Sequence, residues 1–123
     1  MYCLDTNAII YFLKEDPAAI KILGNIFQRN IPLYISAYTE VELFGFRDLS
    51  TFESKRIEEI LETITITPLD SRIARIAGYL RRYYRVQAGD SVIGATCLAL
   101  GTTLLTRNVK DFKKIDNLKI EKI

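Results

Sequence analysis

The sequence from residue 90 to residue 105 reads DSVIGATCLALGTTLL and decides the class of fold. Residues 90–100 are apolar nearly all round, a pattern that predicts a helix buried on every side. Residues 103–105 form a short apolar run of strand length. A buried helix that leads into a buried strand is typical of a sheet covered by helices.

The rest of the chain repeats this alternation of strands and amphipathic helices. Further strands are predicted at residues 2–4, 33–35 and 65–67, with an edge strand at 118–120. Helices are predicted at residues 7–14, from Pro17 onward, at 37–49, around Ile57 to Ile64, and after an N-cap at Asp70. We therefore expect a single domain over residues 1–123, a three-layer α/β/α sandwich with a mainly parallel, twisted sheet.

The amino-acid composition excludes several classes of catalytic and metal site. The 123 residues include no histidine, which excludes Ser/His/Asp and Cys/His nucleophile relays and His-ligated zinc sites. The net charge of +2 is too small to indicate a nucleic-acid partner by itself. Cys3 and Cys97 both lie in apolar runs and are interpreted as buried free thiols of a reducing compartment, hence a cytoplasmic protein. We expect neither a signal peptide nor a membrane span.

Acidic residues follow the predicted strands. Asp5 comes directly after the first strand, and Glu42 lies on the helix after the second. Asp90 starts the apolar helix, and Asp111 follows the strand at 103–105. Ligands bind parallel sheets at the carboxyl ends of the strands, where the strand order reverses. Carboxylates gathered at that edge would repel one another, and a divalent cation such as Mg²⁺ removes the penalty.

Each acid also has a purely structural interpretation. Asp5 and Asp90 could be helix N-caps, as Asp70 is expected to be. Glu42 could close a capping box with Thr39. Local spacing alone leaves both interpretations open.

Four segments, taken in order, favour the metal site. They are Leu4-Asp5-Thr6-Asn7, Ile35-Ser36 through Glu42-Leu43, Asp90 through Thr96, and Leu105-Thr106-Arg107-Asn108-Val109-Lys110-Asp111-Phe112. Together they resemble the PIN-domain family, and more closely the VapC-type ribonuclease toxins of toxin–antitoxin pairs. The resemblance runs the full chain. Ser91 and Gly94 stand where the family commonly has alanine, which are small and conservative departures.

The resemblance implies a function and a set of site residues. Asp5, Glu42 and Asp90 match the family's principal acidic positions, and Thr6, Thr106, Asn108 and Asp111 match weaker ones. It implies an endoribonuclease that uses Mg²⁺, with Mn²⁺ as a substitute, a cognate antitoxin as partner, and a homodimer. The expected metal ligands are Asp5, Asp90 and Glu42, with Asp111 as a further catalytic acid.

Basic residues near these acids suggest how RNA would be held. Arg107 and Lys110 lie beside the expected site and are predicted to contact phosphate, together with Thr6, Thr106 and Asn108. Residues 81–85 interleave arginines with tyrosines, which suits phosphate contact and base stacking, although arginines also favour a helix C-terminus through its dipole.

Two other function classes stay open. One is a PIN-like RNA-binding module without catalysis, and the other is a small phosphohydrolase with Asp5 as nucleophile.

Overall fold

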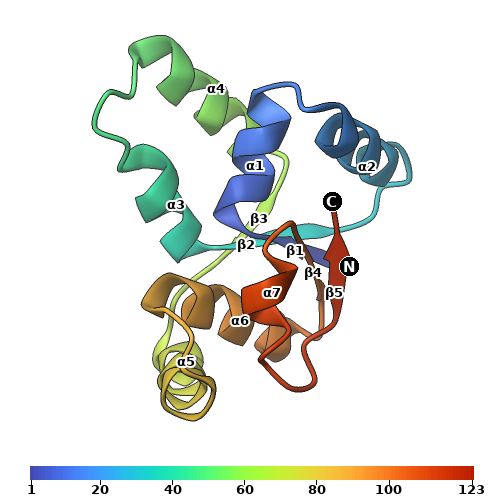
Figure 1. The fold of residues 1–123 in the computed structure, drawn as a ribbon. Coiled ribbons are helices and arrows are strands. Elements are labelled where there is room, and N and C mark those ends of the chain that lie inside the picture. Colours follow the sequence, from blue (N-terminus) through green and yellow to red (C-terminus); the bar gives the residue numbers. More distant parts are fainter.

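The computed structural model describes all residues from 1 to 123 and places a five-stranded sheet between two layers of helices (Figure 1). The strands are β1 (Tyr2–Leu4), β2 (Leu33–Ser36), β3 (Thr65–Thr67), β4 (Thr103–Thr106) and β5 (Ile120–Lys122). They are ordered β3-β2-β1-β4-β5, and every neighbouring pair is parallel. The predicted three-layer α/β/α sandwich is confirmed, and the sheet is wholly parallel.

Seven helices cover the two faces of this sheet. They are α1 (Thr6–Leu13), α2 (Pro17–Gln28), α3 (Ala37–Phe44), α4 (Thr51–Leu61), α5 (Ser71–Tyr84), α6 (Ala88–Leu100) and α7 (Val109–Phe112). Helices α1 to α4 lie on one face, and α5, α6 and α7 lie on the other (Figure 1). None of them has the length and apolar character needed to cross a membrane.

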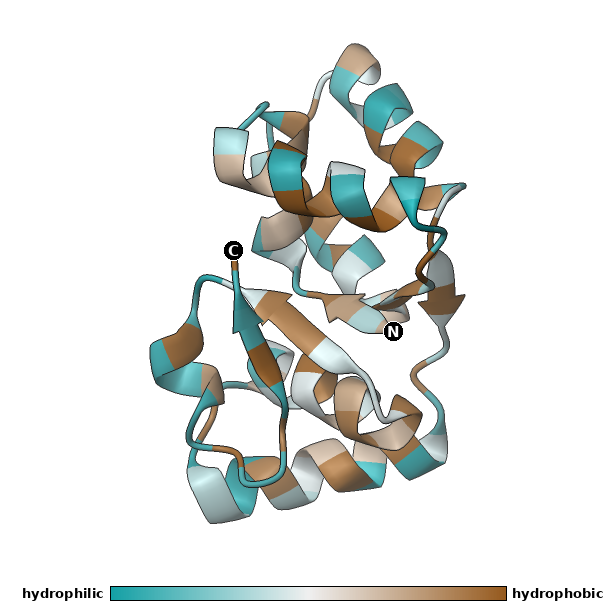
Figure 2. Cartoon of the chain, turned by 90° about the vertical axis from the view of Figure 1, so that its right-hand side faces the viewer, coloured by the Kyte–Doolittle hydropathy of each residue, from teal (hydrophilic) through white to brown (hydrophobic).

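The sheet separates two hydrophobic clusters because successive side chains of a strand point to opposite faces. Leu4 and Leu105 belong to the cluster under α1 to α4. Cys3 and Leu104 belong to the cluster under α5 and α6. Figure 2 shows brown, apolar segments on the sides of the helices that face the sheet. Cys3 and Cys97 are both buried free thiols, as predicted.

The predicted helix at 37–49 is wrong in its second half. Helix α3 ends at Phe44 with Gly45 as its C-cap, and α4 begins only at Thr51. The break falls at Gly45, where a Cβ would lie only 2.6 Å from the Val41 carbonyl oxygen. A second helix then starts: the Ser50 hydroxyl accepts from the Glu53 N–H, while the Glu53 carboxylate accepts from the Ser50 N–H. This capping box fixes a new helix N-terminus, and residues 45–50 become the connection.

Other boundaries also differ from prediction. The helix expected around Ile57 to Ile64 is α4, which runs over Thr51–Leu61. The apolar helix does not start at Asp90, because α6 begins at Ala88 with Gln87 as its N-cap. Helix α1 begins at Thr6, one residue early. The edge strand is present but runs over 120–122, since Leu118 packs on the core cluster and pairing with β4 begins at Ile120. The cap at Asp70 is confirmed, with the Ile73 N–H donating to its carboxylate at 2.9 Å.

The strand order reverses between β1 and β4. From β1 the chain first builds outward through β2 and β3, and it then returns to add β4 and β5 on the other side. The carboxyl ends of β1 and β4 therefore open the crevice in which ligands of parallel sheets bind.

Candidate active site

Asp5 lies at this crevice, directly after β1, and only 5% of its surface is exposed. One carboxylate oxygen, Oδ1, accepts from the Ala8 N–H at 2.8 Å and caps α1. The other, Oδ2, accepts from the Thr106 hydroxyl at 2.5 Å. The capping interpretation of Asp5 is thus correct, but it describes only one of the two oxygens.

Thr106 joins the two strands on either side of the crevice. Its hydroxyl donates to Asp5 and accepts from the backbone N–H of Asn108 at 2.9 Å. Thr106 is fully buried, so no water competes for these bonds. The turn after β4 is thereby fixed against the end of β1.

Glu42 approaches the crevice from α3. Its Oε1 accepts from the Thr6 hydroxyl at 2.5 Å. The alternative of a capping box with Thr39 is wrong, because Thr39 is not the N-cap of this helix. The N-cap of α3 is Ser36, whose hydroxyl accepts from the Tyr38 N–H. Glu42 therefore lies in the second turn of this helix. A Cβ added to Gly89 would lie 3.7 Å from Glu42 Oε2 and 3.1 Å from the Tyr38 ring. The missing side chain at residue 89 lets α6 lie close to α3.

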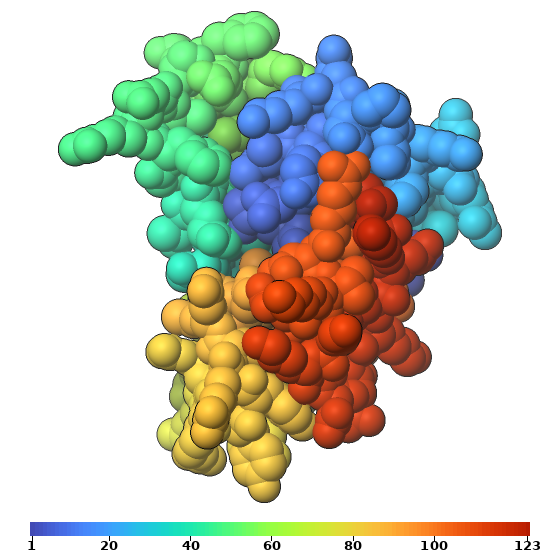
Figure 3. All heavy atoms as spheres, in the orientation of Figure 1, coloured from blue at the N-terminus to red at the C-terminus, as the bar shows by residue number.

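Asp90, in the first turn of α6, completes the set of acids. A cavity of about 530 Å³ is lined by Asp5, Thr6, Asn7, Ile10, Val41, Glu42, Gly45, Phe46, Asp90, Ile93 and Asn108. In Figure 3 the blue α1, the teal α3 and the orange segment after β4 meet on one face of the molecule. Three acids from distant parts of the chain thus share one cavity.

Burial and mutual repulsion act on the carboxylates. The pKa of Asp5 is raised mainly by burial, against the lowering effect of the bonds from Thr106 and Ala8, and the charge of Glu42 raises it further. The pKa of Asp90 is also raised mainly by burial, and then by the charges of Asp111, Asp5 and Glu42. Each of these groups therefore holds a negative charge at a free-energy cost.

The donor set suits a hard cation that keeps part of its water shell. No three His, Cys, Asp or Glu side chains lie close enough together to form a complete metal cage. Mg²⁺ does not need one, since it commonly binds through one or two carboxylates together with waters and phosphate oxygens. The carboxylates of Asp5, Glu42 and Asp90 fit that requirement, and a bound cation would offset their repulsion.

The other predicted residues fall into two groups. Thr6 and Asn108 line the cavity, and Thr106 lies directly beneath it through its bond to Asp5. Asp111, Lys110 and Arg107 are not among the lining residues. The charge of Asp111 still acts on Asp90, although Asp111 itself pairs with Lys114 at 3.8 Å.

Arg107 is turned toward α1 and α2. Its guanidinium forms an ion pair with Asp16 and lies 4.1 Å from the centre of the Tyr11 ring. Its Nε donates to the Ile123 carbonyl at 3.3 Å. These contacts tie the turn after β4 to the opposite helical layer. Contact of Arg107 and Lys110 with RNA phosphate stays a prediction.

Sequence reasoning missed the apolar wall of the cavity. Ile10 lies one helical turn after Thr6 on α1, at the i+4 spacing that places side chains on one side of a helix. That spacing could have identified Ile10 once Thr6 was chosen, whereas Phe46 lies in the connection after α3 and gives no such signal.

Comparison with known proteins identifies the family. A PIN-domain family model matches residues 2–118. Ribonuclease VapC10 of Mycobacterium tuberculosis is 31% identical over 124 residues, which cover 97% of this chain and 91% of that protein. A toxin–antitoxin complex from Klebsiella pneumoniae contains a chain that is 27% identical, with a TM-score of 0.79 over 96% of this chain and 95% of that one. VapBC-1 from nontypeable Haemophilus influenzae matches at 28% identity and a TM-score of 0.80, over 98% and 96% of the two chains. The resemblance drawn from the sequence is confirmed, and the chain belongs to the PIN-domain family.

Proposed function

We propose that this chain is an endoribonuclease that hydrolyses RNA phosphodiesters with the help of Mg²⁺ bound at the carboxylate cavity. The observation that carries the proposal is the meeting of Asp5, Glu42 and Asp90 in one cavity at the crevice between β1 and β4. Relatives named ribonuclease VapC, similar over nearly the whole chain, support RNA as the substrate.

Each acid has a distinct part in this proposal. Asp5 and Asp90 hold the cation, and the bonds from Ala8 and Thr106 fix the orientation of the Asp5 carboxylate. Glu42, held through one oxygen by Thr6, orients or deprotonates the attacking water or binds the cation through water. A bound Mg²⁺ supplies an activated water and stabilises the charge on the leaving oxygen. The expected products carry a 5′-phosphate.

Chelation of metal tests this proposal. RNA cleavage should vanish in excess chelator and return on addition of Mg²⁺ or Mn²⁺, because carboxylate and water ligands suit both ions. Zinc should not be specifically required, since the chain has no histidine. Cleavage that persists in excess chelator would refute the proposal. RNA binding without metal-dependent cleavage would indicate the silent binding module, and a trapped aspartyl-phosphate on Asp5 would indicate the phosphohydrolase.

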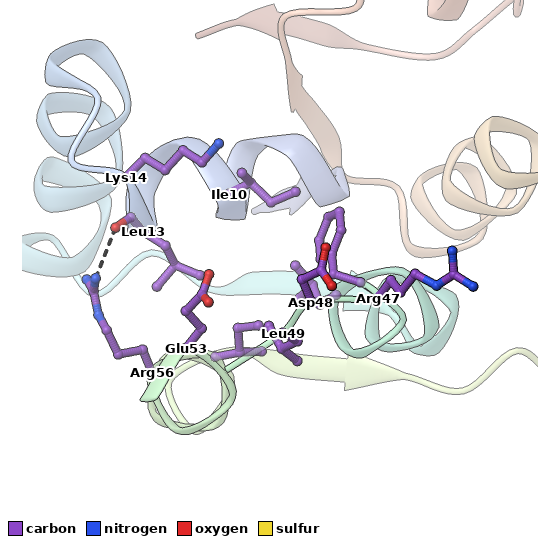
Figure 4. Close-up of a pocket in the computed structure, with 11 residues that line it drawn as sticks. Ile10, Leu13, Lys14, Arg47, Asp48, Leu49, Glu53 and Arg56 are labelled. Atoms are coloured by element: carbon purple, nitrogen blue, oxygen red, sulfur yellow. Dashed lines mark hydrogen bonds between the residues drawn. The ribbon is translucent and has the colours of Figure 1, made fainter. Parts of the chain in front are cut away.

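We also propose that an antitoxin binds beside this site. A groove of about 370 Å³ lies between α1, α4 and the 45–50 connection (Figure 4). It is lined by Ile10, Leu13, Lys14, Leu43, Phe46, Arg47, Asp48, Leu49, Glu53, Arg56 and Ile57. Its floor is apolar and its rim carries charges of both signs, as an amphipathic peptide segment would require. A similar chain from Klebsiella pneumoniae was solved in a toxin–antitoxin complex, which supports an antitoxin as the occupant.

The groove and the cavity adjoin each other. Ile10 and Phe46 line both of them. A peptide bound in the groove would therefore extend to the entrance of the carboxylate cavity and compete with RNA for it. This arrangement gives a physical basis for inhibition of the nuclease by its partner.

A further inference from the structure

Helix α5 carries a concentration of positive charge that the proposed site does not use. Residues 71–89 contain five arginines and no acidic residue, so the remainder of this +2 chain is net negative. The two ion pairs of the structure join Arg107 to Asp16 and Lys114 to Asp111, so none of these five arginines has a carboxylate partner. Four of these arginines lie in α5 and Arg85 is its C-cap, so the helix carries a net positive charge that no ion pair within the chain offsets.

Aromatic rings lie among these charges. Tyr79 and Tyr83 are 44% and 66% exposed, and their rings stack with centres 4.8 Å apart and planes at 23°. The Arg82 guanidinium carbon lies 6.0 Å from the centre of the Tyr79 ring. Tyr84, in contrast, is partly buried and donates from its hydroxyl to Asp116 at 3.4 Å. The two stacked rings thus present flat apolar faces to solvent.

The exposed side chains form one stripe along the helix. Arg72, Arg75 and Tyr79 follow one another at three or four residues, and Arg82 and Tyr83 lie three and four residues after Tyr79. This spacing places all five on the same side of α5, and all five are exposed. We call these five residues the Arg/Tyr stripe. It extends along about 16 Å of helix.

Interactions within the chain do not account for this pattern. The helix dipole favours cations at the C-terminal turn, which explains Arg81 and Arg82. It disfavours them near the N-terminus, where Arg72 is the second helical residue. The core-facing side of α5 is formed by Ile73, Ala77 and Leu80, so the stripe is not needed for packing.

The C-terminal end of the stripe lies near the carboxylate cavity. Helix α5 ends at Tyr84, and the chain reaches Asp90 six residues later in the first turn of α6. The gold α5–α6 segment appears on the same side of the molecule as α1, α3 and the segment after β4 (Figure 3). A strand of RNA that enters the cavity can therefore continue onto this helix.

We propose that the Arg/Tyr stripe is a second RNA-contact surface, which holds single-stranded RNA on its way to or from the cavity. This inference rests on the proposed ribonuclease function. Unpaired arginines would bind phosphates, and the stacked tyrosines would accept bases on their exposed faces. RNA is the occupant that the stripe fits, because charge and stacking are combined at short spacing, and the only carboxylate at the helix N-terminus, Asp70, is bound to the Ile73 N–H as its cap.

Two pairs of variants separate stacking from charge. The variant Tyr79→Ala/Tyr83→Ala is compared with Tyr79→Phe/Tyr83→Phe, which keeps both rings. The variant Arg75→Ala/Arg82→Ala is compared with Lys21→Ala/Arg29→Ala, which removes two exposed charges, on α2 and at its C-cap, on the opposite face of the sheet. Binding of a labelled single-stranded RNA of mixed sequence is measured in Ca²⁺ across a salt series. Circular dichroism and thermal midpoint verify folding.

The alanine pair should weaken binding by about tenfold or more, whereas the phenylalanine pair binds like the parent. The arginine pair should make the salt dependence shallower by about 1.4 in the logarithmic slope, and the α2 control should leave it unchanged. Parent-like affinity and slope in both α5 variants would overturn the inference.

Three patterns distinguish the possible failures. If the α5 variants bind RNA like the parent while the parent still cleaves RNA with metal, the Arg/Tyr stripe does not contact RNA and the nuclease proposal stands. If the parent neither binds nor cleaves RNA, both are wrong. If the variants change only the mass of the protein in sedimentation, the stripe is a protein–protein surface, which also overturns the inference.

Discussion

The negative charges of Asp5 and Asp90 destabilise the folded chain when no metal is bound. Asp5 is almost fully buried, and its carboxylate oxygens accept bonds from Ala8 and Thr106. Asp90 has no role in capping, because Gln87 precedes its helix. The raised pKa of each group means that the metal-free protein would be more stable if the charge were absent.

The pH dependence of the free energy of unfolding tests whether the Asp90 charge destabilises the folded state. A raised pKa means that the folded state keeps the proton longer than the unfolded chain. The free energy of unfolding therefore falls as pH rises from the usual carboxyl value through the raised one. In excess chelator, the free energy of unfolding of Asp90→Asn should not fall over this pH range. The variant should therefore become more stable than the parent as pH rises.

Urea unfolding between about pH 4 and pH 7 measures the difference. Excess Mg²⁺ should reverse it, because a cation that binds the folded parent stabilises that state. Asp70→Asn, at an exposed cap, is the matched control. A difference between Asp90→Asn and the parent that does not vary with pH would contradict the account.

At the scale of elements, β1 and β4 build the site by lying side by side. Their neighbouring carboxyl ends bring Asp5 and Thr106 together although 101 residues separate them in the chain. The Thr106 hydroxyl uses both its donor and its acceptor capacity, toward Asp5 and the Asn108 N–H. The bond between the two strands is therefore also a support of the proposed metal ligand.

Removal of this hydroxyl should weaken both stability and cleavage. Thr106→Val keeps the shape of the side chain but leaves the Asn108 N–H without its acceptor. We expect a loss of about 1–3 kcal/mol in the free energy of unfolding and a fall of about 10–100-fold in RNA cleavage. Urea unfolding and initial cleavage rates measure the two effects.

Thr102→Val is the matched control. The Thr102 hydroxyl is buried without any hydrogen-bond partner, just before β4. Its removal should leave stability unchanged or raise it, and cleavage should stay at the parent level. Equal losses in the two variants would show that the Thr106 bonds have no special role.

The elements themselves could largely be predicted from the sequence, because their hydrophobic patterns match their burial. Apolar patterns predict the buried helix and the short strands, and the position of an aspartate directly before an amphipathic helix predicts the Asp70 cap. The break after Phe44 could not be predicted, since the apolar spacing continues to Leu49, past the C-cap Gly45, and the next helix begins only at the Ser50–Glu53 capping box. The start of α6 was missed because Gln87 caps without a side-chain bond and gives no signal.

The whole molecule places the cavity and the groove next to each other. Helix α1 supplies residues to both, and Ile10 and Phe46 belong to each lining. Figure 4 shows Ile10 and Leu13 on one side of the groove, facing Leu49 and Glu53 on the other. The sequence could indicate which acids form the site. It could not show this neighbouring groove, whose walls come from residues 10–14 and 43–57 and meet only in the folded chain.

Phe46→Glu should disrupt binding of the antitoxin. The ring is half-exposed, and a charge there would have to be desolvated under an apolar peptide face. Phe52→Glu is the control, since Phe52 is 71% exposed and lies outside the groove. The partner to test is the product of the open reading frame that neighbours this gene. Loss of the purified complex with Phe46→Glu alone is expected, and an intact complex would contradict the groove assignment.

The most direct test of the central claim is the rate of RNA cleavage in Mn²⁺ by Asp5→Asn, Asp90→Asn and Asp70→Asn. The first two remove negative charges from the proposed metal site and should cleave at least about 100-fold more slowly than the parent while keeping its fold. Asp70→Asn removes the same charge from an exposed helix cap, and it should cleave like the parent because asparagine caps about as well as aspartate. Near-normal cleavage by either Asp5→Asn or Asp90→Asn would contradict the assignment of the carboxylate cavity as the active site.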